Sequence, residues 1–315
     1  MTGLLLALLL GGYEIRGQLM PGVRASVALH GSLTPFQTAT VSDPAGRFRF
    51  KNIAAGMYTV IVMVPGRGEN RLTIDVGPAV ADEKNRVVLV VRLDEAKMTP
   101  DRSSVVSMRE LSIPEKAKRE YGTAEQRLGE RDVAGAIAAL KRAVEVAPQF
   151  TSAWNLLGTI SYQTRQYQAA EQYFRKGLET NAAAFEPLVN LGGVLLTLQR
   201  ADEAYEYNLR AVLAKPQDAL ANSQLGLNYF MLGKLDLAEK YLLEARRLDP
   251  GHFSHPQITL AEIYLRRGDA ARAADQLEDF LRHHPDWPQA EQMREGIQKL
   301  RKGEQRPVDK GERRS

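Results

Sequence analysis

The sequence predicts a multidomain β + α protein, with a seven-stranded β-sandwich followed by an α-solenoid of five helix-turn-helix repeats and a capping helix. Two observations predict this fold class. A pattern of about 34 residues recurs five times between residues 117 and 287, as in stacked helical repeats. Residues 13–95 instead consist of short β-type runs separated by turn residues. The 315 residues leave room for two domains, and a hydrophobic content of 44% is sufficient for both cores.

The recurring pattern consists of small residues and prolines at fixed places. One position of the repeat is alanine in all five copies, and the position twelve residues later is proline in four of them: Ala136, Ala170, Ala204, Ala238 and Ala273, then Pro148, Pro216, Pro250 and Pro285. Alanine lets two helix backbones approach closely, and proline ends the second helix because it lacks an N–H group. The spacing is 34 residues except for one residue inserted near Gly251.

The second copy has the most complete motif. It reads Trp154-x-x-Leu157-Gly158 and then Ala170-x-x-x-Phe174, which resembles the tetratricopeptide repeat family. The resemblance implies five repeats, with the first and last the least regular, at residues 117–150, 151–184, 185–218, 219–252 and 254–287. Apolar residues at helical spacing in residues 288–302 predict a helix that caps the last repeat.

In residues 13–95, apolar and polar side chains alternate, as in a sheet with one face buried and the other in contact with solvent. Asp43 to Gly46 form a type I turn signal, after which Phe48 and Phe50 alternate with basic residues. The expected strands are Tyr13–Leu19, Ala25–His30, Phe36–Val41, Arg47–Lys51, Met57–Val64, Arg71–Val76 and Arg86–Leu93.

A second resemblance concerns residues 13–95. The string Ser42-Asp43-x-x-Gly46-x-Phe48-x-Phe50, with Gly56-x-Tyr58 after it, is similar to the carboxypeptidase regulatory-like domains. The resemblance implies a prealbumin-like sandwich. It implies no peptidase activity, because the sequence has no His-x-x-Glu pair of zinc ligands.

The chain ends and the joint between the two parts have their own composition. Leu4 to Leu10 is an apolar run typical of a short signal-peptide core, so residues 1–12 are a possible signal-peptide remnant. We expect export to the periplasm or outside the cell, or a cytoplasmic protein if the run is not a signal. Residues 96–116 are either a flexible linker or an extra strand that ties the domains. Residues 303–315 are expected to be a disordered basic tail.

The sequence shows no catalytic chemistry. It has no cysteine, no nucleophile elbow, no phosphate-binding loop and no His-Glu-x-x-His helix. His252, His255, His283 and His284 lie at junctions between repeats and are expected to be exposed loop residues. We therefore expect no catalytic residue, no metal and no cofactor. A net charge of +4 also gives little reason to expect nucleic acid as a partner.

The repeat resemblance implies a partner-binding groove on the concave face, formed by the first helix of each repeat. The candidate groove residues are Asn155, Thr159, Tyr162, Val189, Leu196, Leu227, Phe230, Met231, Ile258 and Leu265. The concave positions from Ser152 to Met231 include no lysine or arginine, so the groove does not resemble the carboxylate clamp of chaperone-binding members. Either the apolar members form one exposed patch, or some of them pack against neighbouring helices.

These observations predict a non-enzymatic scaffold that binds a peptide or protein segment in a largely apolar groove. One alternative is a surface- or carbohydrate-binding sandwich with the repeats as an assembly scaffold, which would need exposed aromatics such as Tyr13, Phe36 and Tyr58. The other is an enzyme with a cluster of perturbed acids or histidines in one cleft. No membrane span is expected, and the oligomeric state is left open.

Overall fold

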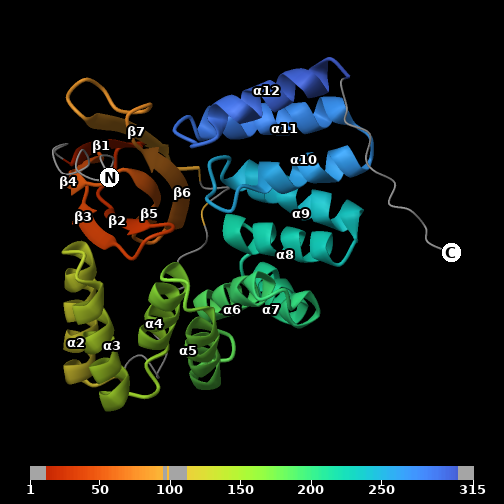
Figure 1. The fold of residues 1–315 in the computed structure, drawn as a ribbon. Helices are drawn as coiled ribbons and strands as arrows, with labels where there is room; N and C mark the ends of the chain where they lie inside the picture. Colours follow the sequence, from red (N-terminus) through yellow and green to blue (C-terminus); the bar gives the residue numbers. More distant parts are fainter. Residues whose placement is uncertain (1–11, 95–97, 99–111, 304–315) are drawn as a thin grey trace, which may run out of the picture.

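The computed structural model describes residues 12–94, 98 and 112–303, and it confirms the predicted fold class (Figure 1). Seven strands form two sheets, and the helices that follow form a solenoid around one side of them. The leucine run, most of the linker and the basic tail lie outside the described residues. Among the described residues, no helix is long and apolar enough to cross a bilayer.

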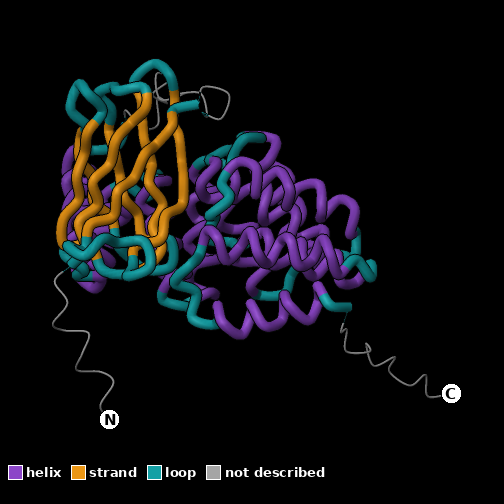
Figure 2. Tube along the Cα trace, turned by 90° about the horizontal axis from the view of Figure 1, so that it is seen from above, coloured by secondary structure: helices purple, strands orange, loops and turns teal. Residues whose placement is uncertain are grey.

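The seven strands expected from the sequence are present, with bounds that differ by a few residues. They are β1 (Tyr13–Met20), β2 (Ser26–Gly31), β3 (Gln37–Val41), β4 (Arg47–Ile53), β5 (Gly56–Val64), β6 (Gly68–Val76) and β7 (Arg86–Arg92). One sheet has the order β4-β1-β7, with β1 and β7 parallel, and the other is antiparallel with the order β3-β2-β5-β6. In Figure 2 the strands stand beside the helical array.

Alternating side chains fill the space between the two sheets. Val60 and Val62 of β5 are fully buried, and the Phe48 and Phe50 rings pack edge to face at 5.9 Å. Gly17 of β1 lies beneath Phe48, since a Cβ there would come within 1.9 Å of the ring. The Asp43–Gly46 turn forms as predicted, with the Gly46 N–H donating to the Asp43 carbonyl at 2.8 Å.

The solenoid consists of five antiparallel helix pairs and a final helix. The pairs are α2 (Glu115–Gly129) with α3 (Val133–Val146), α4 (Thr151–Gln163) with α5 (Tyr167–Thr180), α6 (Phe185–Thr197) with α7 (Ala201–Ala214), α8 (Ala219–Met231) with α9 (Leu235–Leu248), and α10 (Pro256–Arg266) with α11 (Ala270–His283). Helix α12 (Ala290–Arg301) follows as the predicted cap.

Within each pair, a left-handed residue reverses the chain. Arg131, Arg165, Gln199, Gly233 and Gly268 have φ values of 60°, 61°, 61°, 73° and 76°. They recur every 34 residues until the extra residue before the fifth pair, so the backbone repeats as the sequence does. Only the last two pairs have glycine at this position, the residue that adopts this conformation without steric strain.

The repeated alanines lie where helices approach most closely. Ala136, Ala170, Ala204, Ala238 and Ala273 all have an exposed fraction of 0%. Each lies in the second helix of its pair and belongs to an apolar cluster that also contains residues of a neighbouring repeat. Neither helix of a pair could bury its apolar face alone, so stacking of the pairs creates the core.

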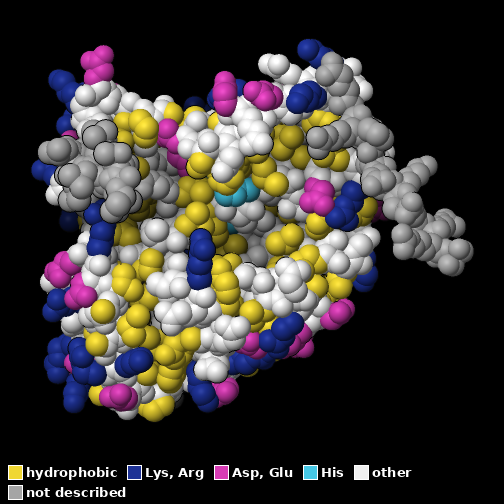
Figure 3. All heavy atoms as spheres, in the orientation of Figure 1, with side chains coloured by type: hydrophobic (Ala, Val, Ile, Leu, Met, Phe, Trp, Pro, Cys, Tyr) yellow, Lys and Arg dark blue, Asp and Glu magenta, His cyan; other side chains and the backbone are white. Residues whose placement is uncertain are grey.

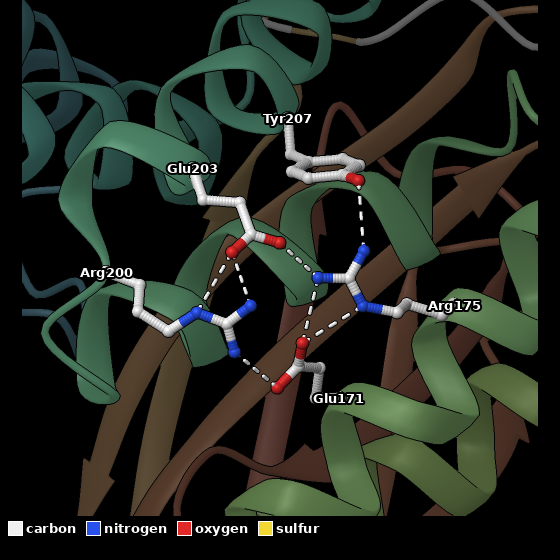
Figure 4. A network of polar contacts seen from close by, with 5 residues as sticks. All are labelled: Glu171, Arg175, Arg200, Glu203 and Tyr207. Atoms are coloured by element: carbon white, nitrogen blue, oxygen red, sulfur yellow. Dashed lines mark hydrogen bonds and ion pairs between the residues drawn. The ribbon is translucent and has the colours of Figure 1, made fainter.

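Charged side chains of the outer helices form a network between repeats, shown in Figure 4. The Arg175 guanidinium of α5 bonds Glu171 at 2.8 Å and also pairs with Glu203 of α7. Arg200 bonds the same two carboxylates, at 2.8 Å to Glu171 and 2.9 Å to Glu203. Because these side chains are partly exposed, between 15% and 42%, water screens their attraction, and the network contributes modestly to the stacking of the second and third pairs.

The alanine register has a direct test. Ala204→Leu and Ala238→Leu should each lower the free energy of unfolding by about 1–3 kcal/mol, because a larger side chain forces the helices apart. Ala138→Leu, the same change at an exposed position of α3, is the control and should be close to neutral. Urea denaturation followed by helical circular dichroism measures the difference. Equal stability of all three variants would contradict the register.

Candidate functional site

The concave side of the solenoid, where the sequence predicts the partner groove, faces the protein's own sandwich. The outer surface of the four-stranded sheet meets the first helices of the repeats. The Gln37 side chain of β3 donates to Glu125 of α2 at 2.8 Å, and Gln163 at the end of α4 donates to the carbonyl of Gly31 at 2.9 Å. The sandwich therefore covers part of the predicted groove.

The second line of contact follows edge strand β6. The Thr73 N–H donates to the Asp249 carboxylate at 2.9 Å, and the Ala79 N–H after the strand donates to Asp286 at 3.0 Å. Asp249 lies in the loop between the fourth and fifth helix pairs, and Asp286 lies in the loop between the fifth pair and the cap helix. An exposed edge strand invites pairing with other chains, and here the repeat junctions occupy part of that edge.

A cleft of about 710 Å³ remains between the sandwich and the first helices. Figure 3 shows the hollow at this boundary, with histidine side chains visible inside it. The sheet contributes His30, Thr59 and Arg71, while the helices contribute mainly hydroxyl, amide and carboxylate side chains from α2, α4 and the N-terminal part of α6. The cleft is thus more polar than the groove predicted from the sequence.

Arg71 of β6 places a cation in the cleft. It was not predicted from the sequence, because the groove was predicted from helix residues alone. Arg71 pairs with Glu69 and lies 3.8 Å from the Glu186 carboxylate at the start of α6. Lys215 lies 3.3 Å from the same carboxylate. Burial alone would raise the pKa of Glu186, but Lys215 and Arg71 hold it below its ordinary value. The alternation of Glu69, Arg71 and Thr73 on the outward face of β6 is the sequence signal for this contact.

Three of the predicted groove residues are polar side chains of α4. Asn155 and Thr159 line the cleft, and Asn155 accepts a hydrogen bond from Asn190 of α6 at 2.9 Å. Tyr162 is 38% exposed, and its hydroxyl lies 3.1 Å from that of Thr197. These side chains remain reachable from the concave side.

The apolar patch is smaller than the sequence suggests. Val189 and Leu196 are each 4% exposed, because they pack into the clusters that join α6 to neighbouring helices, so they are not available to a partner. Leu227 and Met231 are half-buried against the same clusters.

The remaining candidates lie on α8 and α10. The Arg266 guanidinium covers one side of the Phe230 ring at 4.3 Å from its centroid. Ile258 is half-buried, and Leu265 is 42% exposed. Leu227, Phe230, Met231 and Leu265 therefore form the reachable apolar row, which keeps this name below.

The expectation of exposed junction histidines is wrong, since His255 and His283 are half-buried and the other two are buried. His252 and His284 are 5% and 2% exposed, because the junction loops pack against β6 and against each other. The described residues contain no group of three or more metal-binding side chains suited to hold an ion. His252 Nδ1 lies 2.6 Å from the Ser254 hydroxyl, but this hydroxyl donates to Ser223, so the contact shapes the loop and prepares no nucleophile.

A model of the tetratricopeptide repeat family matches residues 121–187. The structure resembles that of PilW, described as a widely conserved type IV pilus biogenesis factor, with a TM-score of 0.52 and 22% identity over 59% of this chain and 86% of that one. The helical region is a tetratricopeptide-like solenoid. At this identity the likeness establishes the fold alone.

Two curated proteins match part of this chain. The human "Cell division cycle protein 16 homolog" is 29% identical over 142 residues, which cover 39% of this chain and 23% of that protein. "Anaphase-promoting complex subunit 3" of Schizosaccharomyces pombe is 24% identical over 157 residues, which cover 50% of this chain and 24% of that protein. The chain thus spans about a quarter of the length of each relative, the part aligned with its repeats.

Arg71 offers a test of the contact between sandwich and solenoid. Arg71→Gln should lower the free energy of unfolding by about 1–2 kcal/mol, because Glu186 and Glu69 lose a partly buried counter-charge. Arg49→Gln is the control, since Arg49 pairs with Glu14 on the opposite sheet, at 3.6 Å and in contact with solvent. Chemical denaturation of both variants measures the difference. An Arg71→Gln variant as stable as the control would mean that the ion pair contributes nothing to docking.

Proposed function

We propose that this protein is a non-enzymatic scaffold that binds an apolar peptide or protein segment along the reachable apolar row. Tetratricopeptide-repeat proteins are generally protein-interaction scaffolds, and the matched family and folds support that class. The proposal rests on one observation: the sandwich covers one part of the concave face and leaves another part uncovered. The sandwich covers its polar part, whereas the apolar row lies on α8 and α10 and does not line the cleft.

The chemistry of the row favours an apolar segment over an acidic tail. Leu227, Phe230, Met231 and Leu265 offer side chains of a kind that lines grooves for amphipathic helices. The cations near this side are already paired: Arg71 pairs with Glu69 and lies near Glu186, and Arg266, which covers Phe230, pairs with Glu262 at 2.6 Å. A free carboxylate would therefore find few unpaired partners in this part of the surface.

The carbohydrate-binding alternative receives less support. It needs exposed aromatic rings on one face of the sandwich. Phe36 and Tyr58 instead pack against each other in the core, with ring centroids 5.7 Å apart. We propose that the sandwich, which resembles carboxypeptidase regulatory-like domains in sequence, serves as a rigid partner of the solenoid.

The enzymatic alternative also lacks what it needs. Asp249, His252 and His255 do form a cluster of perturbed groups beside the cleft. The Asp249 carboxylate, however, accepts a bond from Thr73 across the domain contact, His252 Nδ1 lies 2.6 Å from the Ser254 hydroxyl of its own loop, and the chain has no cysteine to act as a nucleophile. The cluster fits a structural contact better than a catalytic centre.

The apolar row can be tested by comparative capture. Full-length protein and a Leu227→Ala/Phe230→Ala variant are used as baits in extracts of the native host, with Leu213→Ala as a control at a leucine that is 71% exposed on α7. The expected partner is retained by the wild type and the control and lost by the double variant. Its affinity, measured by calorimetry, should fall about 30-fold for Phe230→Ala if that ring is a hot spot, and should change little with salt. Binding that collapses with salt, or that is unaffected by both substitutions, would refute the proposal.

We also propose that the protein is exported, on the basis of the Leu4–Leu10 run. Protein purified from its native host should begin after about residue 10, because a signal segment is removed on export. N-terminal sequencing measures this directly. Intact Met1 in the soluble cytoplasmic fraction would contradict export without affecting the proposal about the apolar row.

A further inference from the structure

The two edge strands of the four-stranded sheet are both held by the solenoid, at opposite ends of its curve. The sheet has the order β3-β2-β5-β6, so β3 and β6 are its edges. Strand β3 contacts the first helix pair, whereas β6 contacts the loops on either side of the fifth pair. In Figure 1 the sandwich accordingly lies in the opening of the curved solenoid, with α2 at one end and α10 to α12 at the other. The sheet therefore spans this opening.

The first anchor, as we call it, joins β3 to the end of α2. The Gln37 side chain donates to Glu125 at 2.8 Å. A Cβ on Gly129 would come within 3.1 Å of the Gln37 carbonyl oxygen, so the helix packs directly on the strand. The Arg131 guanidinium, in the turn that follows, lies 5.6 Å from the centroid of the Phe36 ring. These contacts hold the first helix pair to one edge of the sheet.

The second anchor holds β6 and the residues that follow it. It consists of three polar contacts, which join Thr73 with Asp249 at 2.9 Å, Asp75 with His284 at 3.2 Å, and Ala79 with Asp286 at 3.0 Å. Asp249 precedes α10, whereas His284 and Asp286 lie between α11 and α12. Asp249 and His284 are 6% and 2% exposed, so water has little access to this anchor.

Between the two anchors, the sheet and the helices lie further apart. The cleft of about 710 Å³ is located there, with β5 on one side and α4 on the other. Single side chains reach across it: Gln163 donates to the Gly31 carbonyl at 2.9 Å, and Glu186 lies 3.8 Å from Arg71. The sheet is thus packed on the solenoid near both edges and separated from it in the middle, as a chord is from its arc.

This arrangement matters because a stack of repeats does little to fix its own curvature. Each helix pair contacts mainly its neighbours, and the small rotation from one pair to the next sets the curve. Small changes at successive interfaces add up, so the ends can move much further than neighbouring pairs do. A rigid link between distant pairs removes this freedom. The sandwich can provide it, because its core is close-packed, with Val60 and Val62 fully buried between the sheets.

We infer that the sandwich is a brace that sets the curvature of the solenoid by tying the first helix pair to the loops around the fifth. A change in curvature would pull β3 or β6 from its anchor or deform the sandwich. Both anchors are small and largely polar, so loss of either one releases the solenoid to a wider range of curvatures while each domain retains its own core. The brace rests on the proposal that the sandwich is a rigid partner of the solenoid, and it operates whether or not the apolar row binds a partner.

The absence of cysteine in the chain allows the curvature to be measured directly. Lys116→Cys on α2 and Glu295→Cys on α12 replace exposed residues at the two ends of the solenoid, and each can carry a nitroxide spin label. Double electron–electron resonance on the full-length protein gives the distribution of distances between the two labels, and circular dichroism follows helicity. The protein with both anchors intact should give one narrow distribution.

Two double variants each break one anchor with residues that other repeats carry at the same positions. Gln37→Ala/Arg131→Gly removes side-chain contacts of the first anchor, and the fourth and fifth pairs have glycine at the turn position of Arg131. Asp249→Ala/Asp286→Ala removes two bonds of the second anchor, and earlier repeats have alanine at the corresponding positions, 147 and 183.

A third double variant is the control. Glu145→Ala/Glu179→Ala removes two exposed carboxylates from the outer helices α3 and α5. Each anchor variant should widen the distance distribution at least twofold with helicity unchanged, and the control should leave it narrow. A distribution that is already wide in the wild type, that stays narrow in either anchor variant or that widens equally in the control would overturn the brace, as would a loss of helicity in the anchor variants. No partner is present in these measurements, so their outcome is independent of the capture experiment.

Discussion

The stacking of helix pairs through small residues is the constraint on which the rest of the structure depends. With alanine fully buried at one position of every repeat, the backbones of successive pairs approach closely and in the same way. The regular stack gives the solenoid its curvature, and the curvature creates a concave side wide enough for the sandwich (Figure 1). The larger side chains then fill the space between the pairs.

The two kinds of contact in this protein differ in chemistry. Contacts between repeats are apolar and include the leucines and valines that were candidates for partner binding, such as Val189 and Leu196. Contacts between the sandwich and the solenoid are made mainly by amides, carboxylates and imidazoles, such as Gln37 with Glu125 and Thr73 with Asp249. Polar contacts of this kind are typical of domains that move relative to each other. The solenoid is therefore held together by apolar packing, whereas the sandwich is docked to it by polar contacts.

Periodicity in the sequence predicted the repeated helices and the strands. It did not predict the contacts that occur only once, such as those between the sandwich and the solenoid. The alanine and proline positions located the helices, and alternation located all seven strands, because each signal recurs within a few residues. The bond between Thr73 and Asp249 joins residues 176 positions apart, and no local pattern encodes it. The inserted residue near Gly251 was visible as an irregularity, but its meaning required knowing that β6 lies against that loop. Val189 likewise occupies a position of the repeat that is only half-buried at Asn155 and Ile258, and its packing with residues of α7 and α8 decides its burial.

The turn inside each helix pair has a consequence for how the solenoid comes apart. Arg131, Arg165 and Gln199 adopt a left-handed backbone without the freedom of glycine, whereas Gly233 and Gly268 adopt it readily. Each of the first three turns therefore stores about 1 kcal/mol of strain that the last two lack. In a one-dimensional array, where each unit is held by its neighbours, such differences set the order of local opening. Within the helix pairs, fraying should therefore begin at the turns of the first three pairs and reach those of the fourth and fifth pairs last.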